Sequence, residues 1–360
     1  MKKLLIVFGT RPEAIKMAPI IIKLRDTQPI ETRICVTGQH KDMLYPVLSL
    51  FGIEAHYDLS VMKKEQSLSY VTGAVLDGVS NVLEEYAPDL VLVHGDTTSA
   101  FAGCLASFYK SIPVAHIEAG LRSGDIFSPF PEEFNRRAIS LMSSFHFAPT
   151  EESRTNLISE GINDSSIFVT GNTVIDTLLL TSQMRSELIL PSSPFVLMTV
   201  HRREHSDADI SAIFRAVRRF CIDYPSLCVI YPVHKNPRLL RLSSQILQDL
   251  PNVALTPPLS LVDFHHALRN CHFVLTDSGG VQEEAAYLGR PVLVVRNTTE
   301  RSEGERVGAL KVIGNDEQRI YQAMSALITE KGNYKKVLHS CLAFGDGHAS
   351  QRIIDILQKI

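Results

Sequence analysis

The sequence predicts an α/β protein with two doubly wound, Rossmann-like domains that face each other across a cleft. Short apolar runs alternate with stretches of helical period, which is typical of βαβ units around a parallel sheet. The pattern begins again after a Pro-Ser-Ser-Pro segment at 191–194. The length of 360 residues also exceeds what one core usually serves. Together these observations favour two domains over one.

Composition narrows the class of protein. The chain is 45% hydrophobic and 21% charged, with a net charge of −3, so we expect a soluble protein with no nucleic-acid groove and no membrane partner. The first apolar run breaks at Gly9, too early for a signal peptide, and no run is long enough to span a membrane. The six cysteines form no CxxC pair and are expected to be reduced core residues. We therefore expect a cytoplasmic protein.

The first half reads as alternating strands and helices. No GxGxxG follows the first strand, so the fingerprint of dinucleotide binding is absent and NAD is not supported. A helix is expected to begin at Glu132, directly after Pro131. Strands are predicted at 4–8, 32–36, 90–93, 112–117, 145–148 and 167–169, and helices at 13–24, about 42–51 and 68–85.

The second half repeats this architecture without a fixed-period sequence repeat. A connecting helix is expected to begin in 171–176, and 191–194 is the clearest linker. Strands are predicted at 195–200, 227–231, 253–255, 273–276 and 292–295. Helices are predicted after Gly280 and at about 207–224, 316–329, 333–341 and 348–357.

Carboxylates follow two of the buried strands in the first half. Asp96 comes after the run 90–93, and Glu118 comes after the run that ends at Ile117. Ligands of open parallel sheets bind beyond the carboxyl ends of the strands. A third acidic point is the pair Glu132 and Glu133, which begins the helix after Pro131. Three acidic points at one sheet edge indicate acid/base chemistry.

The second half carries groups that suit a nucleotide. Ser278, Gly279 and Gly280 precede an apolar helix, whose unhindered N–H groups attract phosphate. Glu284, one turn later, could accept two ribose hydroxyl groups. Each feature also has a plainer interpretation: a glycine turn that serves packing, and a carboxylate that complements the helix dipole.

Basic side chains and histidines lie at further turns. Arg11 and Lys16 flank the first strand-to-helix turn, and Arg301 follows a buried strand. Arg11 is placed to bind an oxyanion through two hydrogen bonds. The alternative interpretation is that Arg11 is an ordinary surface arginine. His201 and His234 follow adjacent predicted strands, which favours a site over two structural histidines. No spacing suggests a metal site. A nucleotide-sugar is the simplest substrate that uses both sets of groups.

Taken together, these motifs resemble the non-hydrolysing UDP-N-acetylglucosamine 2-epimerases. The resemblance runs through nearly the whole chain, in order and spacing. It rests on the residues at 8–16, 94–96, 116–122, 131–133, 171–176, 201–204, 277–284 and 299–301.

The resemblance implies a glycosyltransferase-B-like fold and an enzyme that interconverts UDP-GlcNAc and UDP-ManNAc without a cofactor or metal. It also implies a homodimer with a role in polysaccharide biosynthesis. It implies a domain at 1–170 with the carboxylates, a UDP-binding domain at 171–345, and a C-terminal helix at 346–360 that crosses back. The implied acid/base or oxocarbenium-stabilising residues are Asp96, Glu118 and Glu132, and His201 is implied to assist at the leaving group. Glu284 is implied to bind the ribose. The remaining implied substrate-binding residues, which act chiefly at the diphosphate, are Arg11, Lys16, His234, Ser278, Gly279, Gly280 and Arg301.

Some positions depart from the family pattern. Many bacterial members are activated by UDP-GlcNAc at a second site, where this chain has Asp42 and Ala74 in place of a glutamine and an arginine. We therefore expect weak or absent activation. His205 and Ser302 replace the usual asparagine and proline. The alternatives left open are a hydrolysing epimerase, a UDP-sugar glycosyltransferase and a non-catalytic nucleotide-sugar sensor.

Overall fold

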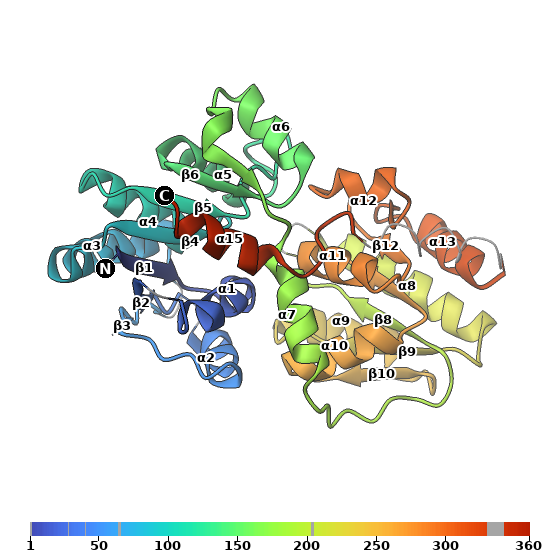
Figure 1. Cartoon of the computed structure of the whole chain (residues 1–360). Coiled ribbons are helices and arrows are strands. Elements are labelled where there is room, and N and C mark those ends of the chain that lie inside the picture. Colours follow the sequence, from blue (N-terminus) through green and yellow to red (C-terminus); the bar gives the residue numbers. More distant parts are fainter. Residues whose placement is uncertain (1, 28, 40, 64–65, 203–204, 330–341) are drawn as a thin grey trace. The chain divides into compact units, whose positions relative to one another are not determined.

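The computed structural model of the chain describes residues 2–27, 29–39, 41–63, 66–202, 205–329 and 342–360 (Figure 1). The chain divides into two compact units, Met1–Thr177 with Gly345–Ile360, and Leu178–Phe344. The sequence placed the corresponding divisions at 170/171 and 345/346. The first division of the structure instead lies within a helix, α7 (Thr173–Ser182).

Unit 1 is built on a seven-stranded sheet whose pairings are all parallel. The order β3-β2-β1-β4-β5-β6-β7 reverses direction at β1 and β4, which is the switch point where doubly wound folds bind ligands. Its strands are β1 (Lys2–Phe8), β2 (Ile30–Val36), β3 (Tyr57–Asp58), β4 (Leu90–His94), β5 (Val114–Ile117), β6 (Phe145–Ala148) and β7 (Ile167–Val169).

Helices cover this sheet in two groups. In one group α3 packs on α4 and α4 packs on α5; in the other, α1 packs on α2 and α15. The central strands β4 and β5 are buried along their whole length, as expected for strands covered on both faces. The helices are α1 (Arg11–Leu24), α2 (Lys41–Leu50), α3 (Leu68–Tyr86), α4 (Thr98–Tyr109), α5 (Glu132–Met142), α6 (Glu151–Ser159) and α15 (Ala349–Leu357), with the short η1 (Asp164–Ser166).

The C-terminal helix α15 belongs to unit 1 because its first turn is tied to α7. Asp176 accepts hydrogen bonds from the backbone N–H groups of Ala349 (3.2 Å) and Ser350 (2.8 Å). Gly171 and Gly345 both have positive φ, 88° and 132°. A Cβ on Gly345 would lie 3.3 Å from Gly171 Cα, so the outgoing and returning chain segments pack closely there.

Unit 2 has a six-stranded parallel sheet of order β10-β9-β8-β11-β12-β13. This is the same doubly wound order as in unit 1, so both sheets are of Rossmann type. Its strands are β8 (Phe195–Thr199), β9 (Cys228–Pro232), β10 (Val253–Thr256), β11 (Phe273–Thr276), β12 (Val292–Val294) and β13 (Leu310–Val312). Its helices are α8 (Asp207–Asp223), α9 (Pro237–Leu247), α10 (Leu261–Asn270), α11 (Gly279–Tyr287), α12 (Ser302–Arg306) and α13 (Glu317–Thr329).

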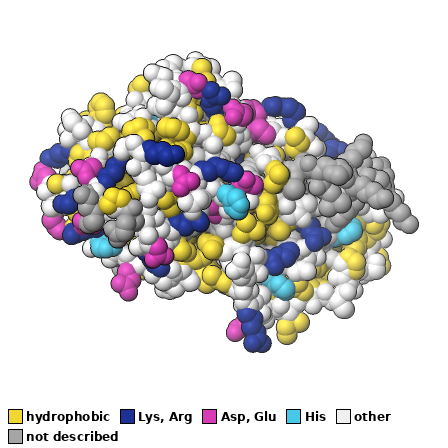
Figure 2. Space-filling model, in the orientation of Figure 1, with side chains coloured by type: hydrophobic (Ala, Val, Ile, Leu, Met, Phe, Trp, Pro, Cys, Tyr) yellow, Lys and Arg dark blue, Asp and Glu magenta, His cyan; other side chains and the backbone are white. Residues whose placement is uncertain are grey.

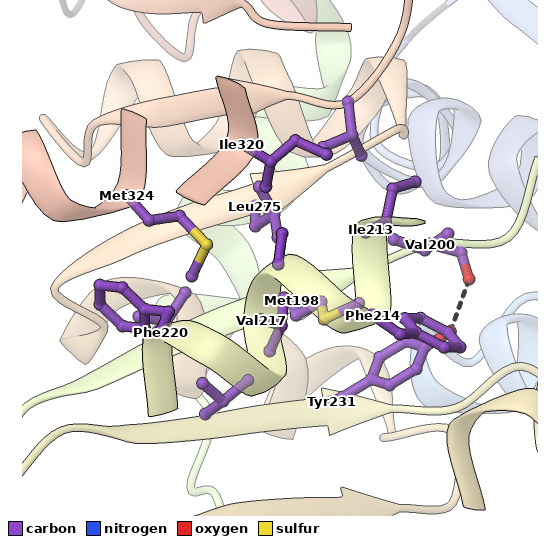
Figure 3. Close-up of a cluster of buried hydrophobic side chains, with 14 of the residues drawn as sticks. Met198, Val200, Ile213, Phe214, Val217, Phe220, Tyr231, Leu275, Ile320 and Met324 are labelled. Atoms are coloured by element: carbon purple, nitrogen blue, oxygen red, sulfur yellow. Dashed lines mark hydrogen bonds between the residues drawn. The ribbon is translucent and has the colours of Figure 1, made fainter. Parts of the chain in front are cut away.

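One face of the second sheet packs on α8 and α13 around a hydrophobic core that contains aromatic rings (Figure 3). Phe214 of α8 and Tyr231 of β9 lie 5.6 Å apart between ring centroids. Tyr231 is fully buried, and its hydroxyl donates to the carbonyl of Val200 at 2.9 Å. The buried hydroxyl therefore has a partner, which avoids the cost of an unpaired polar group.

Several elements were not predicted from the sequence: β3, α6, α9, α10, α12 and β13. In α6 only Ser153 and Leu157 are buried, so its apolar period is too weak to detect. Its start signal was present, because Thr150 caps the helix by accepting from the backbone N–H of Ser153 at 3.1 Å. The helix expected at 333–341 lies outside the described residues.

The surface of the molecule in view shows Lys and Arg interspersed with Asp and Glu (Figure 2). Among the described helices, none combines the length and the apolar character needed to cross a membrane. Five cysteines are present as thiols, and the sixth, Cys341, lies outside the described residues.

Candidate active site

Glu118 follows β5 directly, and its carboxylate is held by side chains of unit 1. Its backbone has a φ of 63°, in the left-handed region. Its carboxylate Oε2 accepts from Asn172 Nδ2 at 2.6 Å and pairs with the ammonium group of Lys16. The Glu118 side chain is 8% exposed, so both contacts act in a partly desolvated setting where charge-assisted hydrogen bonds are strong.

Asp96 lies just beyond the neighbouring strand β4 and is fixed by α5. Arg136 donates through Nε to Asp96 Oδ2 at 2.8 Å, and its second terminal nitrogen lies 2.8 Å from the same oxygen. Asn135 donates to the Asp96 carbonyl at 2.8 Å. The start of α5 and the loop that carries Asp96 therefore form one rigid contact.

The two glutamates that begin α5 have different environments. Glu132, the candidate acid/base residue, is the half-buried first residue of the helix. Glu133 is fully buried, and it accepts from Arg136 at 2.8 Å and from Arg137 at 3.2 Å. Glu133 thus anchors Arg136, which in turn holds Asp96. Sequence reasoning missed Arg136, although its place one turn beyond the acidic pair was a usable signal.

Two histidines in the strands of this site are buried. Burial lowers the pKa of His94 to about 4, although Glu118 and Asp96 oppose that effect. Burial lowers the pKa of His116 to about 3, and its Nε2 lies 2.7 Å from the Gly95 carbonyl. Both rings are therefore neutral near pH 7, and neither adds positive charge beside the carboxylates.

The turn between β1 and α1 is occupied by the side-chain carboxylate of Glu13. Glu13 is buried and accepts from the backbone N–H groups of Gly9 (3.0 Å) and Thr10 (2.8 Å). It also accepts from the Thr97 hydroxyl at 2.8 Å. Burial raises the pKa of Glu13 to about 7, while these donors lower it. Sequence reasoning missed Glu13, although Thr10-x-x-Glu13 has the spacing of a capping box.

Arg11 and Lys16 were both predicted to bind substrate. Arg11 is the half-buried first residue of α1. Lys16 is 7% exposed, and its ammonium group contacts Glu118. Lys16 therefore belongs to the carboxylate cluster of unit 1.

In unit 2, the N-terminus of α11 carries a guanidinium group. Ser278 is the N-cap, and Gly279 begins the helix. A Cβ on Gly279 would lie 2.6 Å from Arg301 Cζ, so only glycine lets the guanidinium lie against the first turn. Helix dipole and arginine add their positive potentials there, which suits a phosphate group.

Arg301 is held in this place by buried carboxylates. Its Nε donates to Glu283 at 2.8 Å, and a terminal nitrogen donates to Glu300 at 3.3 Å. Glu300 also accepts from Arg296 at 2.9 Å. All four side chains are at least nine-tenths buried. Arg301 is therefore preorganised, as bidentate oxyanion recognition requires.

His201 and His234 are brought together as the sequence predicted. They follow the adjacent strands β8 and β9, and their rings stack with centroids 6.1 Å apart. Buried Asp277 lies 3.1 Å from His201 Nδ1 and accepts from the backbone N–H of His201 at 2.8 Å. Burial alone raises the pKa of Asp277, but His201, His205 and the Arg202 backbone N–H outweigh it and hold that pKa well below its usual range.

Glu284, the predicted ribose ligand, is buried in α11. His265 Nε2 lies 3.2 Å from Glu284 Oε1, and its Nδ1 lies 2.6 Å from the Thr181 hydroxyl. The Thr181–His265–Glu284 chain fixes the direction of the carboxylate.

Across the described ranges, no group of three or more His, Cys, Asp or Glu residues has the arrangement of a metal site.

Comparisons with known proteins identify the family. Residues 22–358 match the family model described as UDP-N-acetylglucosamine 2-epimerase. The chain is similar to the UDP-N-acetylglucosamine 2-epimerase of Bacillus subtilis, with 46% identity over 99% of this chain and 94% of that protein. It is also similar to the enzyme of the same name from Escherichia coli K12, with 43% identity over 99% and 98% of the two chains.

Solved structures agree with this assignment. A crystal structure of UDP-GlcNAc 2-epimerase from Neisseria meningitidis bound to UDP-GlcNAc has a TM-score of 0.95 and 44% identity, and covers 99% of this chain and 100% of that one. A Staphylococcus aureus MnaA–UDP structure has a TM-score of 0.94 and 43% identity, with 100% and 96% covered. The fold is therefore the glycosyltransferase-B-like fold of two Rossmann domains. The chain belongs to the UDP-N-acetylglucosamine 2-epimerase family.

Proposed function

We propose that this chain is a non-hydrolysing epimerase that interconverts UDP-GlcNAc and UDP-ManNAc. The observation that carries the proposal is the division of chemistry between the units. Unit 1 holds Asp96 and Glu118 at adjacent strand ends, and unit 2 holds Arg301 against the N-terminus of α11. Relatives with 43–46% identity carry the epimerase name, which supports the same reaction here.

The reaction proceeds by elimination and re-addition. The C2 proton is not next to a carbonyl, so its direct removal is very unfavourable. Departure of UDP from C1 gives an oxocarbenium-like centre that acidifies the C2–H bond. A carboxylate takes the C2 proton, the electron pair forms the C1–C2 double bond, and 2-acetamidoglucal and UDP result. Re-addition of UDP to C1, with protonation of C2 from the opposite face, inverts C2.

The residues of unit 1 act on the hexose. Proton transfer on two faces of C2 needs more than one acid/base group, and Asp96, Glu118 and Glu132 supply them. Glu118 accepts from Lys16 and from Asn172, so donors already orient its carboxylate. This suits the removal of a proton or the stabilisation of the oxocarbenium charge.

The residues of unit 2 hold the nucleotide. Arg301 and the backbone of Ser278, Gly279 and Gly280 bind the diphosphate, with help from His234. His201 assists the departing phosphate, and Glu284 binds the ribose. Fixed positive groups at the departing phosphate stabilise the charge that develops as C1–O breaks.

One experiment separates this proposal from its alternatives. UDP-GlcNAc is incubated with the protein in deuterated water, and C2 is followed by NMR. Epimerisation places deuterium at C2 of both UDP-GlcNAc and UDP-ManNAc. Free ManNAc and UDP would indicate a hydrolysing enzyme, and an unchanged sugar would indicate a transferase or a sensor. Glu118→Gln is the matched control, and we expect it to abolish exchange.

We also propose that UDP-GlcNAc activates the enzyme weakly or not at all. Ala74 of α3 packs partly against the core of unit 1 and offers no group to bind a second diphosphate. Turnover of UDP-ManNAc without added UDP-GlcNAc is therefore expected to start at full rate. A sigmoidal dependence on UDP-GlcNAc would contradict this.

We further propose that the protein is cytoplasmic. The five described cysteines are thiols, which is typical of proteins in a reducing compartment.

A further inference from the structure

Glu118 is held in an uncommon backbone conformation at the end of β5. Its φ of 63° lies in the left-handed region, which residues other than glycine seldom occupy. Such conformations persist only where the surroundings hold them, and they gather at functional sites. The groups that hold Glu118 therefore decide where its carboxylate points.

Asn172 is one of these groups, and its side-chain amide has a single orientation. Its Oδ1 accepts from the backbone N–H of Val174 at 3.1 Å, at the start of α7. Its Nδ2 must then face the other way, where it donates to Glu118 Oε2 at 2.6 Å. Asn172 is 3% exposed, and a Cβ on Gly345 would lie 3.2 Å from its backbone nitrogen. The hydrogen bond from the Val174 N–H and the burial of Asn172 therefore hold the amide in this orientation.

The other charged and titratable groups near Glu118 complete its surroundings. Lys16 of α1 contacts the same oxygen, Oε2. His94 of β4 interacts with Glu118, Lys16 and Asp96, and burial keeps its ring neutral near pH 7. Lys16 supplies positive charge, whereas Asn172 supplies a neutral donor in a fixed direction. The two side chains therefore do different things for the same carboxylate.

We infer that Asn172 is a positioning residue that aligns Glu118 for proton transfer at C2. This inference rests on the proposed epimerase function. Asn172 also precedes α7, and α7 runs from unit 1 into unit 2. The segment that joins the units therefore begins with the residue that orients a candidate catalytic carboxylate.

Two substitutions separate positioning from a role in folding. Asn172→Ser keeps an oxygen that can accept from the Val174 N–H but is too short to reach Glu118. Asn172→Asp keeps the same shape and acceptor, but replaces the donor with a second carboxylate. Asn163→Ser is the matched control, because exposed Asn163 caps η1 through Ser165 N–H at 3.0 Å and lies outside the site.

We expect Asn172→Ser to lower kcat by about tenfold or more, with KM for UDP-GlcNAc changed by about twofold or less. Asn172→Asp is expected to lose more activity at pH 8 and to regain part of it as the pH falls towards 5.5. At low pH a proton shared between the two carboxylates restores a donor to Glu118. The control variant keeps the kcat, KM and pH profile of the wild type.

The results distinguish the inference from the function on which it rests. A wild-type protein that does not exchange deuterium at C2 would overturn the proposed function, and the inference with it. An active wild type with unchanged kcat and pH profile in both Asn172 variants would overturn the inference alone. The same holds if both variants lose thermal stability while kcat per folded enzyme stays constant.

Discussion

Buried carboxylates accept hydrogen bonds that hold together separate segments of this chain, and Glu13 is the clearest example. It accepts from two backbone N–H groups of the first turn and from the Thr97 hydroxyl of the next strand-to-helix turn. It therefore occupies the helix N-terminus that in dinucleotide-binding folds receives a phosphate. The Glu13 carboxylate thus satisfies backbone N–H groups of this turn without a bound anion.

Glu13 is expected to make stability depend on pH. Burial raises its pKa from 4.5 to about 7, so folding favours the protonated form. Its contribution to stability is complete below about pH 4.5 and is lost as the pH rises through 7, which corresponds to about 3 kcal/mol. Urea unfolding of wild type and Glu13→Gln across this range measures the effect.

The free energy of unfolding of the wild type should fall relative to that of Glu13→Gln as the pH rises. Glu54→Gln, at an exposed position, serves as the control and should follow the wild type. Parallel curves for wild type and Glu13→Gln would contradict the assignment of this group.

Asp277 is expected to set the ring orientation of His201. Its Oδ1 lies 3.1 Å from His201 Nδ1, so it favours the form of the imidazole whose Nδ1 carries the proton. Asp277→Asn keeps an acceptor for the backbone N–H groups but not for the ring. We expect kcat for epimerisation to fall on the order of 100-fold, with a small change in KM.

Steady-state kinetics of Asp277→Asn and of Asp223→Asn test this expectation. Asp223 is an exposed partner of Tyr321 in the same unit, and its substitution should leave kcat unchanged. An Asp277→Asn enzyme with the kcat of the wild type would show that His201 does not need this carboxylate.

Among the elements, the start of α11 combines helix geometry with side-chain placement. The turn after β11 brings Ser278 and Gly279 to the helix N-terminus, and Arg301 packs where a Cβ of Gly279 would stand. Neither part alone would be a strong anion site. Together they place a desolvated guanidinium beside the N–H groups of the first turn.

Gly279→Ala is expected to weaken the binding of UDP by about tenfold, which corresponds to about 1.4 kcal/mol. The added methyl group would displace Arg301 from its contacts with Glu283 and Glu300. Isothermal titration with UDP measures the loss. Gly73→Ala, in α3, is the control, because a Cβ there meets no atom within 4 Å. An unchanged affinity of Gly279→Ala would argue against Arg301 as a diphosphate ligand.

At the scale of the whole molecule, α4 and α5 expose an apolar face. Phe108 and Tyr109 end α4 with 54% and 67% exposure, and Leu141 near the end of α5 is 81% exposed. The rings of Phe134 of α5 and Phe101 of α4 meet edge to face, with centroids 5.9 Å apart. An apolar face of this kind on a two-helix surface suits an isologous contact with a second copy.

We propose that the chain forms a homodimer and that this face is its interface. Leu141→Asp would then convert the dimer to a monomer, because a charge buried in an apolar contact is costly. Size-exclusion chromatography with light scattering measures the mass. Ile158→Asp is the control, since Ile158 of α6 is also exposed, at 43%. A Leu141→Asp protein that elutes with the mass of the wild-type dimer would exclude this face.

Long, strongly periodic elements such as α3 and α8 were predicted to within a few residues at each end. Short or weakly apolar ones such as α6, α10 and β13 were not, because their burial depends on neighbours that are distant in sequence. In the same way, His201 and His234 were predicted to lie at the ends of adjacent strands, where the structure has them. The packing of Arg301 against Gly279 was not foreseen, because no local pattern signals it.

The sequence by itself determined the alternation of strands and helices, and with it the placing of Asp96 and Glu118 beyond the ends of two buried strands. Only the tertiary structure decided what holds them. Arg136 is 40 residues from Asp96, and Asn172 is 54 residues from Glu118. Local periodicity follows from the geometry of the backbone, whereas the partner of a buried charge is set by which segments pack together.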